Sequence, residues 1–189
     1  MALEDDLARA REAAGAQAEP GEEVVGIIPT EPGGTRVYLC AYASGDGNER
    51  GWLALDEEGR SVTDRALVRD AVSLAALCEL AEESAGGGHL GELRARLVEL
   101  RLTENPEGIE DAELAAAQLQ QTIEPPPRVA SLAYLDAIGA AAARLEQTLG
   151  QAGGSPFAEA MKSGLAAADE LAAQVERSYK LPLASDSSS

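Results

Sequence analysis

The sequence predicts an α+β fold in which a small N-terminal three-stranded antiparallel sheet packs on a predominantly helical bundle of about five helices. Residues 23–56 hold three β-rich runs separated by short turn sequences, and the roughly 120 residues that follow show Ala- and Leu-rich helical periodicity. Short connections favour antiparallel neighbours, because parallel strands need long crossovers. Aromatic residues make up only 3% of the chain, so we expect an aliphatic core.

The first expected element is a short helix over residues 2–17. Leu3, Leu7 and Ala10 lie at helical spacing, and a glycine then supplies a stop. Residues 1–22 are therefore expected to form an N-terminal helix or arm ahead of the sheet.

Three strands are expected next. The first is the β-branched run at residues 24–28, which a proline ends, the second spans residues 36–42, and the third spans residues 52–56. Successive side chains of a strand point to opposite faces, so Tyr38 and Tyr42 share one face of the second strand.

The helical region begins with residues 63–84, which we expect to form the central helix. It is expected to cover one face of the sheet, because three short strands cannot stand alone. Ser61 or Thr63 is placed to cap its start. A second helix begins near His89 and is the only basic element of the chain.

An acidic helix is expected over residues 107–123. Asn105 and Pro106 have the order of a cap followed by the first helical residue, and Leu114 and Leu119 are expected to face inward. The preceding helix carries arginines, so we expect the two helices to pack side by side with complementary charges.

Two more helices are expected after the three prolines at residues 125–127, which cannot continue a helix. Residues 128–149 and 155–181 show helical periodicity and are joined by a short Gly-containing loop, which is typical of an antiparallel hairpin. The pattern leaves open whether this hairpin packs within its own chain or is exchanged between copies.

These elements divide the chain into four segments. Residues 1–22 form the N-terminal helix or arm, and residues 23–124 form the strand meander with its helices. Residues 128–182 form the C-terminal hairpin, which we expect to pack with the preceding region as one domain. The Ser-rich residues 183–189 are expected to be a disordered tail.

Composition restricts the possible partners. The formal net charge of −18 argues against binding to nucleic acid or to an anionic membrane, because both need clustered Lys and Arg. No apolar run is long enough for a membrane span, and the acidic start is unlike a secretory signal. We expect a cytoplasmic protein, and the excess of Ala, Arg, Gly and Leu over Lys is typical of a bacterial coding bias.

No cofactor or metal site is predicted. Cys40 and Cys78 lie on different elements without neighbouring Cys or His at metal-ligand spacing, so we expect two buried free thiols. The glycines at residues 86–88 precede a helix, but no strand precedes them and no Lys or Ser follows, so they predict a helix stop rather than a phosphate-binding loop.

The side chains with reactive chemistry are few. Asp56, Asp64 and His89 stand near the edge between strands and helices, and an enzyme would need His89 within reach of a carboxylate in a closed pocket. No residue is assigned a catalytic role on this basis.

Tyr38, Tyr42 and Trp52 hold most of the aromatic content and are the predicted partner-binding residues. If they share a face, they form an aromatic patch for a protein partner.

The leading functional hypothesis is a non-enzymatic protein-interaction or regulatory protein, with a second copy of the chain as a candidate partner. Two alternatives stay open: a small enzyme with a site near Asp56, Asp64 and His89, and an acidic nucleic-acid mimic that binds a basic protein.

Overall fold

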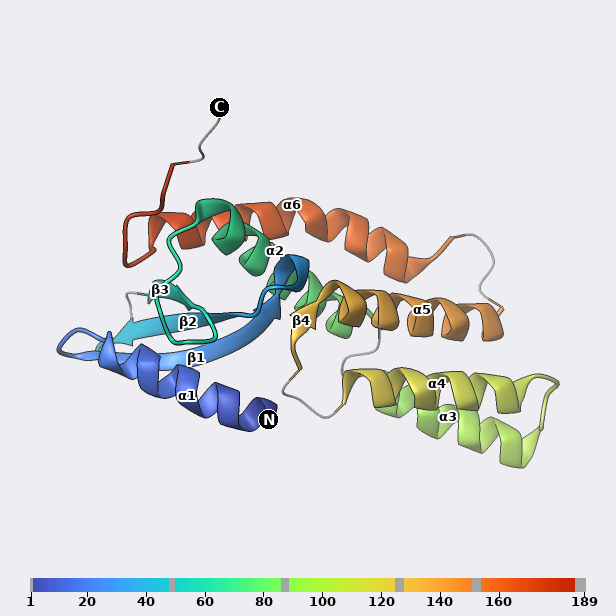
Figure 1. The fold of residues 1–189 in the computed structure, drawn as a ribbon. Coiled ribbons are helices and arrows are strands. Elements are labelled where there is room, and N and C mark those ends of the chain that lie inside the picture. Colours follow the sequence, from blue (N-terminus) through green and yellow to red (C-terminus); the bar gives the residue numbers. More distant parts are fainter. Residues whose placement is uncertain (1, 48–49, 86–88, 125–127, 151–153, 186–189) are drawn as a thin grey trace. The chain divides into compact units, whose positions relative to one another are not determined.

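The computed structural model describes residues 2–47, 50–85, 89–124, 128–150 and 154–185 (Figure 1). The chain forms two compact units. The sheet unit comprises Met1–Ala76, Val129–Leu132 and Ala166–Ser189, and the helical unit comprises Leu77–Arg128 and Ala133–Leu165. The division falls within two long helices, so each of these contributes residues to both units.

The predicted α+β class is correct, but the sheet is four-stranded and mixed. Its strands are β1 (Glu22–Glu31), β2 (Val37–Ser44), β3 (Arg50–Leu55) and β4 (Ala130–Ser131), in the order β3-β2-β1-β4. The first three pair antiparallel, as expected from their short connections. The fourth strand was expected to be part of a helix over residues 128–149, and it instead pairs parallel to β1.

Strand β1 is longer and less regular than expected. It continues through Pro29 to Thr30 and Glu31, which pair with β4. Proline is tolerated there because no described strand lies beside the outer edge of β1 before Thr30. A bulge between Val24 and Gly26 leaves Val25 exposed. A bulge and an edge proline both discourage pairing with foreign strands.

Different helices cover the two faces of the sheet (Figure 1). Helix α1 (Leu3–Ala16) packs on the face that carries Tyr38, Cys40 and Tyr42. The opposite face of β2 packs against α2 (Arg65–Ala85) and the last part of α6 (Pro156–Arg177). The expected alternation of side chains along β2 is therefore seen, and α2 has the covering role that was predicted for it.

The chain returns to the sheet after α6 and covers the edge of β3. The N–H of Trp52 donates to the carbonyl of Ser178 at 3.0 Å, and the N–H of Lys180 donates to the carbonyl of Trp52 at 2.9 Å. Leu183 packs against the core, and the N–H of Ala184 donates to Thr63 at 2.8 Å. The start of the expected tail at residues 183–189 is therefore part of the fold, and residues 186–189 lie outside the described residues.

The helical unit is built from α3 (His89–Thr103), α4 (Ile109–Ile123) and α5 (Leu132–Thr148) with the adjoining parts of α2 and α6. Its aliphatic core contains the following buried residues: Ala81, Leu90, Leu97, Ile109, Ala112, Ala115, Ala116, Leu119, Ile138 and Leu145. Small alanines let the helices approach closely, and each contributes a modest burial.

Helices α3 and α4 pack side by side with an ion pair between them, as the sequence predicts, and they run antiparallel. Arg101 Nε lies 3.1 Å from Glu113 Oε2, and Arg94 donates to Gln120 Oε1 near the other end of the pair. The first contact joins the C-terminal half of α3 to the N-terminal half of α4, and the second joins the N-terminal half of α3 to the C-terminal half of α4. The two helices therefore run antiparallel.

Two predictions about this pair are wrong. Asn105 does not cap α4, because it has a left-handed φ of 44° just after α3, and the residue before α4 is Gly108 at φ 81°. Leu119 is buried as expected, but Leu114 is 50% exposed on the outer side of α4. The predicted glycine stop at residues 86–88 and the triproline joint at residues 125–127 lie outside the described residues.

Within the described residues, no helix combines the length and apolar character that crossing a membrane requires.

Candidate functional site

Asp56 stabilises the turn that follows β3. Its Oδ1 accepts the backbone N–H groups of Glu58 at 3.0 Å and Arg60 at 2.9 Å, and its Oδ2 accepts the Arg60 guanidinium at 2.9 Å. Partial burial alone would raise the pKa of Asp56, but the hydrogen bonds from Arg60 outweigh it and hold the pKa below its usual value. The carboxylate is therefore ionised and occupied by its own turn.

Asp64 caps the beginning of α2. Its Oδ1 accepts the backbone N–H groups of Ala66 at 3.0 Å and Leu67 at 3.3 Å. Free N–H groups at a helix start are normally satisfied in this way by a short polar side chain. The cap that the sequence assigned to Ser61 or Thr63 is thus made by their neighbour.

His89 is not in the closed pocket that the enzyme hypothesis requires. Its side chain is 96% exposed at the start of α3, and its Nδ1 lies 4.0 Å from Glu92 Oε2. It belongs to the helical unit, whereas Asp56 and Asp64 belong to the sheet unit. Across the described ranges, no group of three or more His, Cys, Asp or Glu residues could hold a metal ion.

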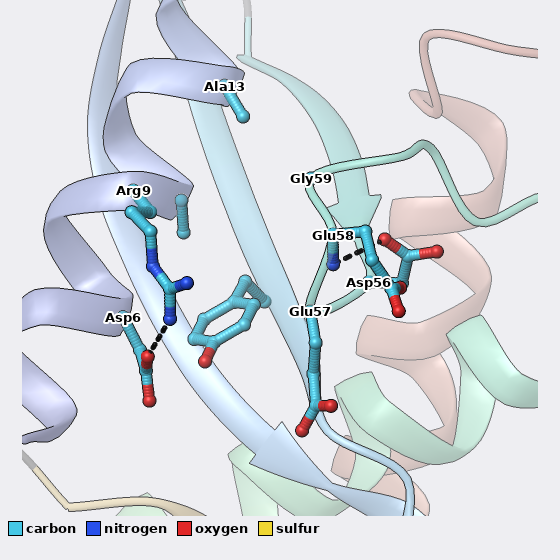
Figure 2. A pocket seen from close by; sticks show the side chains of 9 residues that line it. Asp6, Arg9, Ala13, Asp56, Glu57, Glu58 and Gly59 are labelled. Atoms are coloured by element: carbon cyan, nitrogen blue, oxygen red, sulfur yellow. Dashed lines mark hydrogen bonds and ion pairs between the residues drawn. The ribbon is translucent and has the colours of Figure 1, made fainter. Parts of the chain in front are cut away.

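A recess of about 420 Å³ lies between α1 and the turn after β3 (Figure 2). Asp6 and Arg9 line it from α1, where they form an ion pair, and Glu57 and Glu58 line it from the turn. Carboxylates outnumber cations around it, so its field attracts positively charged groups. We assign no reaction to it, because no nucleophile with a neighbouring base lines its walls.

The predicted aromatic residues do not form one surface. Tyr38 and Tyr42 are buried in the cluster that α1 covers, and the hydroxyl of Tyr42 donates to the carbonyl of Ala14 at 2.8 Å. Trp52 pairs with Ala41 and lies in the cluster on the opposite face. A role of these residues in binding a partner stays a prediction, with Trp52 the only one of the three that is not buried.

Two residues that the sequence did not single out connect the C-terminal segment to the sheet. The hydroxyl of Tyr179 donates to the carbonyl of Val62 at 2.5 Å and accepts the N–H of Ala54 at 2.9 Å. The ammonium group of Lys180 pairs with Glu22 and lies 4.2 Å from the centre of the Tyr42 ring. The sequence offered one signal that could have drawn attention to these two residues: Tyr and Lys are both rare in this chain.

Helix α3 carries a second apolar surface that no described element covers. Its inward side holds Leu90 and Leu97, which are buried in the core of the helical unit. Four other residues, spaced at i, i+4, i+7 and i+11, lie along a separate line on the helix and are all exposed. We call this line the outer stripe, and it consists of Gly91, Ala95, Val98 and Leu102. The side chains of Val98 and Leu102 are 42% and 75% exposed.

No protein-family model, curated protein or solved structure matches this chain. The functional argument therefore rests on the residues and the geometry given above.

Proposed function

We propose that the protein is a non-enzymatic protein-interaction or regulatory protein that associates with itself. The observation that carries the proposal is the outer stripe of α3, in which two large apolar side chains lie in register on a regular helix and face solvent. Apolar surface that is ordered in a stripe is typical of a helix that packs against another helix.

The energetic reason is the transfer of these side chains from water. Full burial of a Val or Leu side chain contributes about 1.5 to 3 kcal/mol; Leu102, at 75% exposed, has gained little of this within the chain, and Val98, at 42% exposed, has gained only part of it. A partner that covers them would release this free energy. The two small residues of the stripe, Gly91 and Ala95, leave room for a second backbone to come close.

The polar residues considered for chemistry have structural roles that fit this proposal. Asp56 holds a turn and Asp64 caps α2. Tyr42, which was predicted as a partner-binding residue and not as a reactive one, is a neutral hydrogen-bond donor inside the sheet unit, because burial raises its pKa to about 12.

Sedimentation velocity of the untagged protein over a wide concentration range tests the proposal. We expect a species heavier than the 19.6 kDa chain to increase with concentration. A protein that stays at the mass of one chain at every concentration would show that self-association is wrong.

A further inference from the structure

Charged residues border the outer stripe in a regular order. Arg94 and Arg101 follow one side of the stripe, and Glu92 and Glu99 follow the other. Written as a heptad, the stripe occupies positions a and d, the two arginines occupy position g, and the two glutamates occupy position e. In coiled coils, positions e and g determine which helices pair and in which direction.

We infer, building on the self-association proposed above, that the outer stripe pairs α3 in parallel with α3 of a second copy of this chain. In a parallel pair the two-fold axis runs along the helices, so the arginine border of each copy faces the glutamate border of the other. Arg94 precedes Glu99 by five residues, which is the separation at which position g of one helix meets position e of its partner. Because the dimer is symmetric, the ion pair between Arg94 of one copy and Glu99 of the other forms twice.

An antiparallel pair of the same stripes would bring like charges together. Its two-fold axis is perpendicular to the helices, so arginine borders would face each other on one side and glutamate borders on the other. Each chain also carries a net charge of −18, which repels a second copy. In the parallel arrangement, the attraction between the arginine and glutamate borders of the two copies opposes this repulsion.

The present contacts of Arg94 and Glu99 leave both side chains available for an ion pair with a second copy. Arg94 donates to the neutral amide of Gln120, so a carboxylate is a stronger acceptor for it. Glu99 forms no ion pair with any residue that the structure describes. Arg101 differs, because it is held by Glu113, and the sequence offers no glutamate five residues after it.

The contact is short, which limits its strength. Helix α3 has 15 residues, about 22 Å of helix, and its stripe covers fewer than two full heptads. Such a segment does not form a coiled coil as a peptide, but the folded chain presents it already as a helix. We therefore expect a reversible dimer with a dissociation constant of about 10 μM or weaker.

The first test disrupts the apolar part of the stripe. Leu102→Glu should raise the dissociation constant at least about tenfold, because it places a charge in the dimer contact. Leu132→Glu is the matched control, since Leu132 is 60% exposed and lies outside the stripe. A dimer that is indifferent to Leu102→Glu would overturn the assignment to α3 and leave the proposed self-association intact.

The second test exchanges the bordering charges. Glu99→Arg should weaken the dimer even though it lowers the net negative charge, because it faces Arg94 of the second copy with a like charge. The double change Arg94→Glu with Glu99→Arg should restore the wild-type affinity to within about threefold. Glu92→Arg makes the same change of charge on the same border and should not weaken the dimer, since the residue five positions before it is Gly87. A stronger dimer with Glu99→Arg would overturn the parallel direction.

The third test reads the direction from crosslinks. Gly91 and Leu102 lie near the two ends of the stripe, about 16 Å apart along the axis, and a side chain at Gly91 meets no other atom. In a parallel dimer, Gly91→Cys and Leu102→Cys should each form a disulfide with the same residue of the second copy. Both native cysteines are buried, so the background is low. Failure of both variants to crosslink would overturn the parallel dimer.

Discussion

The C-terminal segment and helix α3 use their large side chains in opposite ways. Tyr179 fills a space between the sheet and the loop after β3, and its hydroxyl both donates and accepts a hydrogen bond. Leu102 of α3 lies in a regular helix and remains 75% exposed. The comparison shows that a side chain in an irregular segment can make all its contacts within its own chain. A side chain in a regular helix can instead stay exposed and available to a partner.

The largest effect is expected from removing the Tyr179 ring. Tyr179→Ala should lower the free energy of unfolding of the sheet unit by about 3 kcal/mol, because it creates a cavity and leaves the N–H of Ala54 without its hydrogen-bond acceptor. Urea unfolding followed by the fluorescence of Trp52, which bridges to Tyr179, measures it. Tyr179→Phe keeps the ring and should lose only about 1 to 2 kcal/mol. Equal losses for the two variants would show that the ring itself contributes nothing.

A loss of stability at alkaline pH should follow from the buried tyrosines. Burial raises the pKa of Tyr42 and of Tyr179 to about 12, so the folded state favours their neutral forms. Their contribution is complete below pH 10, where the unfolded chain also keeps its tyrosines protonated, and it is lost as the pH rises from about 10 to about 12. The pH dependence of urea unfolding checks this, and Tyr179→Phe should make the decline shallower. A flat profile up to pH 12 would contradict it.

A smaller effect is expected from Lys180. Lys180→Met keeps the apolar stem but removes the ion pair with Glu22 and the cation above the Tyr42 ring, so it should reduce stability by about 1 kcal/mol. The hydrogen bond from Lys180 is the main reason that the pKa of Glu22 is lowered. This contribution is present above the unfolded pKa of Glu22 and is lost as the pH falls through the folded value. The Lys180→Met variant should therefore lose less stability than the wild type as the pH falls into the acid range. An unchanged dependence of stability on acid pH would contradict the role given to the pair of Lys180 and Glu22.

The smallest effect on stability is expected on α3. Leu102→Glu should change the free energy of unfolding of the monomer by no more than about 0.5 kcal/mol, because the side chain is exposed. Thermal unfolding followed by circular dichroism at low concentration measures it. A loss above about 1 kcal/mol would mean that Leu102 is covered within the chain, and it would remove the contrast with Tyr179.

Local patterns in the sequence were sufficient for much of the fold. The period-2 run at β2 and the helical periodicity of α2 are both dominated by side chains that are buried against a neighbour, and both elements form where they were expected. Strand β4 could not be found in this way, because two residues have no period and their pairing with Thr30 and Glu31 is non-local. Tyr179 was missed for the same reason, since its partners Val62 and Ala54 lie more than a hundred residues earlier.

The candidate surface on α3 was predictable only in part. Periodicity predicts one apolar face of this helix, made of Leu90, Leu93, Leu97 and Leu100. Leu90 and Leu97 are buried, but Leu100 is 37% exposed, and the same helix holds a second line of apolar residues through Val98 and Leu102. Which line faces the core depends on the position of α4, and that depends on tertiary contacts. The aromatic residues of β2 and β3 were grouped by composition, and the register of the two strands separates Trp52 from the tyrosines.

The return of the chain to β3 also has a consequence during translation. Tyr179 closes onto Ala54 across a separation of 125 residues, so the ribosome must complete both units before this edge is sealed. Until then the outer edge of β3 lacks the backbone partners that Ser178 and Lys180 supply to Trp52. The order of synthesis therefore makes this small sheet one of the last parts of the molecule to mature, although its strands are among the first to emerge.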